Sequence, residues 1–489
     1  MTTDGLDDLG HRASRGIVVT ASGLWSKTLI QLVSTVVLAR LLAPEDFGLL
    51  AMVTAIVGVA ELLRDFGLTG AIIQAKEIEE RVWSSLLWLS LALGTMLAII
   101  VAAAAPLIAG LYDEQRLVVL TLAIAPTLIV NSLAMPLMAR LTRGLRFTTL
   151  ATIDVAAMFA GVVASVVAAV LGLGVWALVV LTVVQQVGRV IMLLTAVRPT
   201  FGRPRIEREI LPFVSTGGSI LGAELLNYAE RNLDNVIIGQ QLGSAVLGQY
   251  SRAYALFMLP LQQMNGPIGR VALPVLSRLR EEPHRYRRYV RSAILVIGYL
   301  TIPTYAVAAA VADPLIFVLL GPGWEQAASI FALLAIAGVA QAIGKVRGWL
   351  YITLGRSHRQ FVYDLVTRPL VIIGFFVGIA LGGVDGLVLL YGILSLVLLI
   401  PGFGFAIRGT FVRAGDIVAP TVRPVIMAAV AFAAAFTVTR VLVLPEVLEL
   451  LVGSAAGVAS FALALVLPVY RRDIGLIWGF VKQMRRPRR

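Results

Sequence analysis

The sequence predicts an all-α integral membrane protein with about fourteen transmembrane helices, arranged as two six-helix lobes followed by two further helices. Of the 489 residues, 58% are hydrophobic and 14% are charged, whereas soluble domains average roughly 45–50% apolar and about 25% charged residues. Apolar runs of about 20 residues, long enough to cross a bilayer, recur along the whole chain. In addition, parts of the first half return about 200 residues later, which indicates an internal repeat.

The predicted spans follow one another with short connections and account for most of the chain. Their apolar periodicity is helical, and they exceed the ~9–11 residues of a barrel strand, which excludes a β-barrel. In chain order they cover residues 16–40, 47–73, 83–111, 117–140, 147–172, 174–197, 211–242, 246–277, 287–320, 326–354, 360–382, 384–407, 417–444 and 447–470. The acidic start MTTDGLDDLG shows no cleavable signal peptide, so we expect the first span to be an uncleaved signal anchor.

The formal net charge of +13 is distributed unevenly between the two sides of the predicted membrane. If the first span starts inside, both termini and every second loop hold 28 of the 41 Lys and Arg residues. The opposite loops hold only Arg40, Arg116 and Arg440. Cytoplasmic loops of membrane proteins carry such an excess of basic residues. Both termini are therefore predicted to be cytoplasmic, and the charge requires no nucleic-acid partner.

The basic tail after the last span, residues 471–489, has the pattern of an interfacial helix. Ile474, Ile477, Trp478 and Val481 recur at helical spacing between clusters of basic residues. Such a helix lies at the membrane surface, where its charge favours anionic lipids as partners. Its simplest role is to anchor the topology.

No cofactor or metal is expected. The chain contains no cysteine, and its three histidines fall in loops far apart in the sequence. A phosphate-binding loop is missing, because Val346 follows Lys345 and Val339 stands where the first glycine would be. Glu45 and Asp46 are interpreted as the first turn of the second span, where acids stabilise a helix N-terminus, rather than as a catalytic metal site. The chain is therefore not expected to hydrolyse ATP, and any coupled process would use an ion gradient or the membrane potential.

The internal repeat predicts two units of six spans each. VVLARLLAPEDFG (36–48) aligns with VIIGQQLGSAVLG (236–248) at an offset of 200. Because six is even, both units start on the same side, and transporters with parallel repeats bind substrate between their halves. At an offset of 210, Arg146 and Asp154 align with Arg356 and Asp364.

The repeat also predicts the domain organisation. The first 15 residues form a cytoplasmic N-terminus, and the two repeat units are joined by a basic cytoplasmic linker. The predicted parts are residues 1–15, the N-lobe 16–198, the linker 199–210, the C-lobe 211–408, the last two helices 409–470 and the interfacial tail 471–489.

Polar residues form a stripe on the first helix of each repeat unit. In the first span, Lys27 and Ser34 lie on one helix face, and in the seventh span Glu224, Arg231 and Asp234 do so in the same register. Ionisable residues in spans face a bundle interior or a watery cavity. Cations there suit a phosphate or pyrophosphate headgroup.

Further ionisable residues lie in other spans. Arg252 and Arg270 project at similar angles if the eighth span is continuous, but its three prolines predict a bend that could serve as a gate. Arg64 follows Glu61 at helix spacing, as Arg368 follows Asp364, and a structural or interfacial pairing is the favoured interpretation of both pairs. Lys345 lies in the tenth span, where Arg347 is a candidate for snorkelling to the headgroups.

The chain resembles the polysaccharide transporters, the O-antigen and exopolysaccharide flippases of the multidrug/oligosaccharidyl-lipid/polysaccharide exporter superfamily. LARLLAPEDFGLLAM (38–52) looks like the turn between their first two helices, and FGLTGAIIQ (66–74) looks like the exit of their second helix. NLDNVIIGQQLGSAVLGQYSRAYALFMLPLQQMNGPIGRVALPVLSRL (232–279) is similar over the longest stretch. The resemblance covers essentially the whole chain. It departs from the pattern at Gln240, where a basic residue is often expected.

The resemblance implies a two-lobed flippase of the bacterial inner membrane, and not an enzyme. It would move an undecaprenyl-pyrophosphate-linked oligosaccharide from the cytoplasmic to the periplasmic leaflet by alternating access. Polysaccharide polymerase and chain-length proteins are candidate partners, and we expect a monomer. The expected headgroup-binding residues are Lys27, Arg64, Arg231, Arg252, Arg270 and Lys345, and the expected ion-coupling residues are Glu224 and Asp234.

Two alternatives stay open on the sequence. A small-molecule cation antiporter would share the architecture, but the excess of cations in the spans argues against a cationic drug. A polyprenol-dependent glycosyltransferase or polymerase would require a long outward loop, and the predicted outward loops are short.

Overall fold

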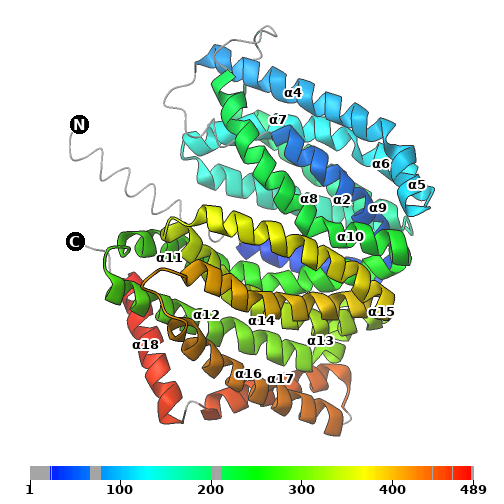
Figure 1. Ribbon diagram of the computed structural model, residues 1–489. Coiled ribbons are helices and arrows are strands. Elements are labelled where there is room, and N and C mark those ends of the chain that lie inside the picture. Colours follow the sequence, from blue (N-terminus) through cyan, green and yellow to red (C-terminus); the bar gives the residue numbers. More distant parts are fainter. Residues whose placement is uncertain are drawn as a thin grey trace. The chain divides into compact units, whose positions relative to one another are not determined.

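The computed structural model describes the backbone of residues 23, 25–65, 79–199, 202, 211–442, 444–464 and 466–485. These residues form helices and short connections without a strand, so the all-α prediction is confirmed (Figure 1). Ten helices of this described part are long and apolar enough to cross a membrane. The chain is therefore a multi-pass membrane protein, while the number of fourteen spans stays a prediction.

The chain divides into two compact units, residues 1–248 and 249–489. The first unit begins with a helix over residues 25–41. It continues with α2 (Pro44–Asp65), α4 (Glu80–Ala103), α5 (Ala105–Tyr112), α6 (Arg116–Ile124), α7 (Pro126–Arg143), α8 (Phe147–Val170), α9 (Val175–Val197) and most of α10 (Leu211–Pro260).

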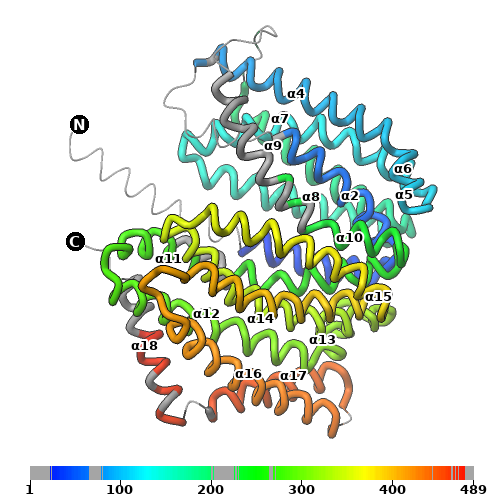
Figure 2. The backbone as a smooth tube through the Cα atoms, in the orientation of Figure 1, coloured from blue at the N-terminus to red at the C-terminus, as the bar shows by residue number. Residues whose placement is uncertain are grey.

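The second unit contains the end of α10 and all later helices. They are the π-helical turn η2 (Leu261–Asn265), α11 (Gly266–Arg278), α12 (Pro283–Ala310), α13 (Ala312–Leu320), α14 (Glu325–Thr353), α15 (Ser357–Ile407), α16 (Gly415–Val441), α17 (Glu446–Ala464) and α18 (Pro468–Arg485). Within this unit α12 packs against α16, and α14 packs against α15 (Figure 2).

The boundary between the compact units differs from the predicted lobe boundary. Most of the predicted linker 199–210 lies outside the described residues, and the division into lobes stays a prediction. The first part of α10 belongs to the first unit because it packs on α2 there. The hydroxyl of Tyr228 donates a hydrogen bond to the carbonyl oxygen of Thr54 over 3.0 Å.

Two glycine breaks interrupt helices that are otherwise continuous. In α10 the break is Gly243, whose φ of 83° is a left-handed conformation that glycine adopts without strain. In α15 it is Gly382 and Gly383, where the backbone leaves the helical region. Both breaks fall between spans that the sequence separates, and they allow the chain to reverse direction in a minimum of residues.

The repeat is visible in equivalent close contacts. A Cβ atom on Gly48 would overlap the carbonyl oxygen of Ser244, and one on Gly248 would overlap that of Pro44. These four positions are related by the offset of 200, so the two helix starts cross symmetrically. We call this contact the glycine crossing.

The offset of 210 is also reflected in hydrogen bonds. Arg146 donates to the carbonyl oxygen of Ala196 over 3.3 Å in the first unit. Arg356 donates to that of Ala406 over 3.5 Å in the second. Each arginine thus ties the start of one helix of a hairpin to the end of the next, which supports the predicted internal repeat.

Local predictions at helix ends are confirmed. Glu45 and Asp46 lie in the first turn of α2, where the Asp46 carboxylate accepts a hydrogen bond from the Ala43 N–H over 3.0 Å. In the eighth span, where a bend is predicted, α10 ends at Pro260 and the backbone becomes π-helical over Leu261–Asn265. Proline produces such distortions because it lacks the N–H of the helical ladder.

The predicted interfacial tail is a helix that begins three residues earlier than expected, as α18. Its Asp473 is buried, accepts a hydrogen bond from the Tyr299 hydroxyl over 2.8 Å and pairs with Arg423 over 2.6 Å. Ile477 packs against the same cluster, whereas Trp478 is exposed. The tail therefore packs one face on the second unit and leaves an aromatic side chain exposed, and its position at the membrane interface stays a prediction.

Candidate functional site

The predicted site residues of the first unit occupy different environments. Lys27 and Arg64 are half-buried, on the helix over residues 25–41 and in the last turn of α2. On α10, Arg231 is exposed, whereas Asp234 is only 6% exposed and accepts a hydrogen bond from the Asn235 N–H over 2.8 Å. The burial of Asp234 therefore fits a position facing the interior of the helix bundle better than the exposure of Arg231 does.

The remaining predicted site residues are distributed as follows. Arg252 is half-buried near the end of α10, and Lys345 is exposed on α14. The side chains of Glu224 and Arg270 lie outside the described part of the structure. A cavity shared by all of these residues therefore stays a prediction.

An ion pair between α8 and α9 is the functional candidate that the sequence reasoning missed. Arg189 Nη2 lies 2.8 Å from Asp154 Oδ1, and the side chains are 24% and 29% exposed. Both residues lie about 10 Å or more from the ends of their helices at ~1.5 Å per residue, and both helices are long and apolar enough to cross a membrane. The Arg189 Nε–H is buried and has no acceptor among the described residues. The pair thus retains a free donor on a helix that could span a membrane.

The equivalent region of the second unit is arranged differently. Asp364, the repeat partner of Asp154, lies 3.6 Å from Arg368, four residues further on the same helix. The Arg347 guanidinium lies 4.8 Å from the ring centre of Tyr363, a cation–π contact. The ion pair supports the structural interpretation of Arg368, whereas snorkelling of Arg347 stays a prediction. The contacts of this region therefore differ between the two units.

We expect the Asp154–Arg189 pair to stabilise the first unit. Arg189→Gln should lower the free energy of unfolding by about 2 kcal/mol, because it leaves a carboxylate without its partner in the membrane. Asp154→Asn in the same chain should restore part of the loss, with a double-mutant coupling energy of about 1–2 kcal/mol. The measurement is unfolding in detergent by titration with dodecyl sulfate.

The matched control is the Asp364–Arg368 pair, whose geometry is longer and local to one helix. Its coupling energy should stay near ~0.5 kcal/mol, the range of helix pairs at this spacing. Equal coupling energies for the two pairs would contradict the distinction drawn from their geometry.

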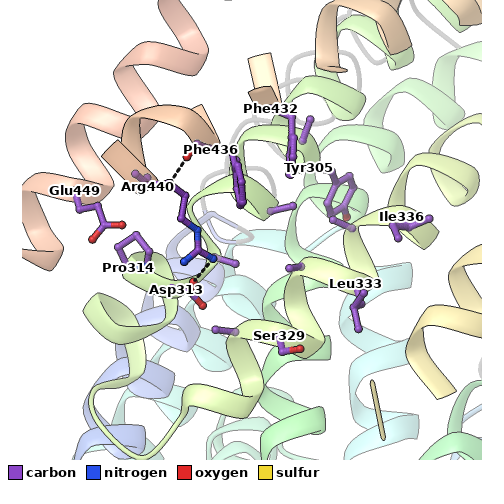
Figure 3. Close-up of a pocket in the computed structure, with 18 of the residues that line it drawn as sticks. Tyr305, Asp313, Pro314, Ser329, Leu333, Ile336, Phe432, Phe436, Arg440 and Glu449 are labelled. Carbon is purple, nitrogen blue, oxygen red and sulfur yellow. Dashed lines mark hydrogen bonds and ion pairs between the residues drawn. The ribbon is translucent and has the colours of Figure 1, made fainter. Parts of the chain in front are cut away.

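A cavity of about 450 Å³ lies in the second unit between α12, α13, α14 and α16. Its walls are formed by small residues of α12 and α14, and Phe432 and Phe436 stack along one side (Figure 3). Arg440, Asp313 and Glu449 gather at its charged edge (Figure 3). We call it the alanine cavity; its alanines are Ala306, Ala309, Ala310, Ala312, Ala328, Ala332 and Ala335.

Comparison with known sequences relates the chain to proteins of surface-polysaccharide synthesis. It is 25% identical over 370 residues to the lipopolysaccharide biosynthesis protein WzxC of Escherichia coli (strain K12), which covers 73% of each chain. It is 24% identical over 372 residues to the teichuronic acid biosynthesis protein TuaB of Bacillus subtilis (strain 168), covering 76% of this chain and 77% of TuaB. The succinoglycan biosynthesis transport protein ExoT of Rhizobium meliloti (strain 1021) is 26% identical over 314 residues, 63% of this chain and 62% of ExoT.

Comparison with solved structures shows the same fold in two transporters. The inward closed conformation of the lipid II flippase MurJ superposes with a TM-score of 0.73 at 13% identity, covering 94% of this chain and 100% of MurJ. An inward-facing multidrug resistance MATE family transporter of the MOP superfamily superposes with a TM-score of 0.61 at 17% identity, covering 81% and 95%. At these identities the likeness shows the fold alone, and it confirms the predicted fold class.

The family follows from a match over more than half of the chain. Residues 37–329 match the profile of the polysaccharide biosynthesis protein family. This range contains α2, the glycine crossing, the Asp154–Arg189 pair and the first helices of the second unit. The chain belongs to the polysaccharide biosynthesis protein family and has the fold of the transporters MurJ and MATE.

Proposed function

We propose that the protein is a flippase for a polyprenyl-pyrophosphate-linked oligosaccharide, the repeat unit of a surface polysaccharide. It would carry this lipid from the cytoplasmic to the periplasmic leaflet of a bacterial inner membrane, with both termini cytoplasmic. The names of its relatives describe polysaccharide biosynthesis and transport, and the fold is that of a lipid flippase. The observation that carries the proposal is the set of cationic side chains that this transporter fold holds in its spans.

The chemistry of these cations fits the headgroup. A pyrophosphate offers several anionic oxygens, and guanidinium groups bind such oxygens through charge-assisted, often bidentate hydrogen bonds. Half-buried cations such as Lys27, Arg64 and Arg252 can meet a headgroup without full exposure to water. Interactions of this kind shield the headgroup charge during its passage across the apolar membrane interior.

Alternating access requires a driving force other than ATP, because the sequence has no phosphate-binding loop. The buried carboxylate of Asp234 is the best-supported coupling candidate among the described residues, since it is removed from solvent. Glu224 remains a candidate by its register. Binding of a proton or cation to such a group would neutralise its charge and change the relative stability of the two access states.

The proposal excludes catalysis by this chain and treats anionic lipids, a polymerase and chain-length proteins as its partners, with a monomer as the working unit. The cation antiporter remains the second candidate, supported by the likeness to the MATE fold. The cationic character of the residues in the spans favours an anionic headgroup over a cationic drug.

The test is translocation of a lipid-linked oligosaccharide between leaflets of proteoliposomes. We expect Arg231→Gln and Arg252→Gln each to slow translocation at least about tenfold, because a charge-assisted contact contributes roughly 1.5–3 kcal/mol. The amount of inserted protein should be unchanged.

The matched control is Arg285→Gln, which removes an exposed cation that pairs with Glu282 over 2.7 Å in the first turn of α12. It should translocate at the rate of the unmodified protein. Normal translocation by both the Arg231 and Arg252 variants would refute their assignment, and absence of translocation by the unmodified protein would refute the function.

A further inference from the structure

The walls of the alanine cavity are apolar and lie within membrane-spanning helices. α12, α14 and α16 are each long and apolar enough to span the membrane. The cavity is lined by the last turns of α12 and α16 and by the first half of α14, which places it toward one end of these helices. The sequence predicts that this end faces outward.

Such a cavity is unfavourable for water and for empty space alike. Water would find few hydrogen-bond partners along the alanine walls, and an empty cavity would forfeit the dispersion contacts of its lining. A volume of about 450 Å³ lies within the ~300–1,000 Å³ range of ligand-binding pockets. The nearest apolar filling in a membrane is a hydrocarbon chain.

The charged edge of the cavity restricts the headgroup of that lipid. Arg440 lies 4.0 Å from Asp313, and its guanidinium lies 5.2 Å from the ring centre of Phe436. Glu449 completes this edge from α17 (Figure 3). One cation and two carboxylates repel a headgroup with net negative charge. They complement a headgroup that carries both a phosphate and an amine.

We propose that the alanine cavity holds one acyl chain of phosphatidylethanolamine, with the lipid phosphate beside Arg440 and the ammonium group beside Asp313 and Glu449. A primary ammonium group donates three hydrogen bonds, as a lysine does. The trimethylammonium group of phosphatidylcholine has no N–H to donate. The site thus selects a zwitterionic aminophospholipid and is separate from the binding of the anionic pyrophosphate carrier.

The experiment measures lipid retention by native mass spectrometry of the full-length protein in detergent. Dioleoyl phosphatidylethanolamine, phosphatidylcholine and phosphatidylglycerol are the probes, since they differ only in headgroup. We expect one molecule of phosphatidylethanolamine to be retained at a concentration about tenfold lower than the other two, as one or two charge-assisted hydrogen bonds would produce.

Two variants locate the site. Ala332→Phe fills the cavity from α14 and should abolish retention, while Arg440→Gln should weaken it about tenfold. Ala433→Phe is the matched control, because Ala433 is exposed on α16 and does not line the cavity. It should retain the lipid like the unmodified protein.

The outcomes decide the proposal. Equal retention of the three lipids, preference for phosphatidylglycerol, or no retained lipid would each overturn it. An equal loss in the Ala332 and Ala433 variants would also overturn it, because the chain would then not occupy the cavity. If Ala332→Phe does not fold, as judged by its thermal unfolding, the smaller Ala309→Leu replaces it with the same expected loss.

Discussion

Replacing Gly248 with leucine is expected to prevent stable folding of the protein in the membrane. At the glycine crossing, any Cβ atom on Gly248 would overlap the carbonyl oxygen of Pro44. The obstacle is backbone, so it cannot move aside as a flexible side chain would. Overpacking of rigid sites typically costs about 1–3 kcal/mol, and we expect Gly248→Leu to exceed this range.

The measurement compares the amount of inserted protein and its unfolding in detergent across a graded series. Gly248→Ala should already destabilise by about 1–3 kcal/mol. Gly48→Ala should do the same, because its Cβ would overlap the carbonyl oxygen of Ser244. Leucine at either position should reduce folded protein further.

The matched control for this series is Gly348→Ala on α14, where a Cβ atom would meet no other atom within 4 Å. It should be neutral or stabilising by up to about 1 kcal/mol, because alanine favours a helix over glycine. Wild-type stability of Gly248→Leu would show that the two helix starts are not held at this distance.

The succession of helices was predictable because a membrane helix needs about 20 apolar residues. Residues 360–382 and 384–407 are separated in the sequence by glycine, and α15 leaves the helical conformation at Gly382 and Gly383. The glycine crossing could be predicted in part from the sequence, because the aligned segments 36–48 and 236–248 both end on glycine. Only the structure shows that the two backbones come into close contact at these glycines.

The polar contacts between helices were harder to predict. Asp154 and Arg189 lie at similar distances from the turn between α8 and α9, which allows them to meet, but sequence does not show which helix faces touch. Arg231 and Asp234 were placed on one face, yet one is exposed and the other buried. Residues three apart differ by about 60° around a helix, enough to separate the two environments.

The alanine cavity had no signal in the sequence. Alanine is common in membrane helices, and these alanines come from three separate helices. Only the packing of α12, α13 and α14 brings them together. Its charged edge likewise combines Asp313, Arg440 and Glu449 from different helices, so no local pattern reveals it.

Asp416 is the side chain whose removal should most destabilise the second unit. Its carboxylate is 0% exposed and accepts hydrogen bonds from Arg287 Nε and Arg291 Nε, each over 2.6 Å. The Arg413 N–H donates to it over 2.9 Å. The carboxylate thereby joins α12 to the first turn of α16.

Asp416→Ala should therefore lower the free energy of unfolding by about 3 kcal/mol, the lower end of the range for breaking a buried ion pair. The lower end applies because the side chain of Arg291 is 52% exposed and can be rehydrated. Asp416→Asn should recover only part of the loss, since the amide keeps one acceptor but no charge. Unfolding in detergent gives the free energies.

The control replaces an exposed carboxylate, that of Glu282, which directly precedes the first residue of α12. Glu282 pairs with Arg285 at the surface, and exposed pairs contribute about 0–1 kcal/mol. Glu282→Ala should thus leave unfolding nearly unchanged, because water replaces the lost partner. A loss for Asp416→Ala as small as that for Glu282→Ala would contradict this prediction. It would mean that apolar packing alone holds α12 against α16. The attraction between Asp416 and its arginines would then only offset the free-energy cost of burying the carboxylate.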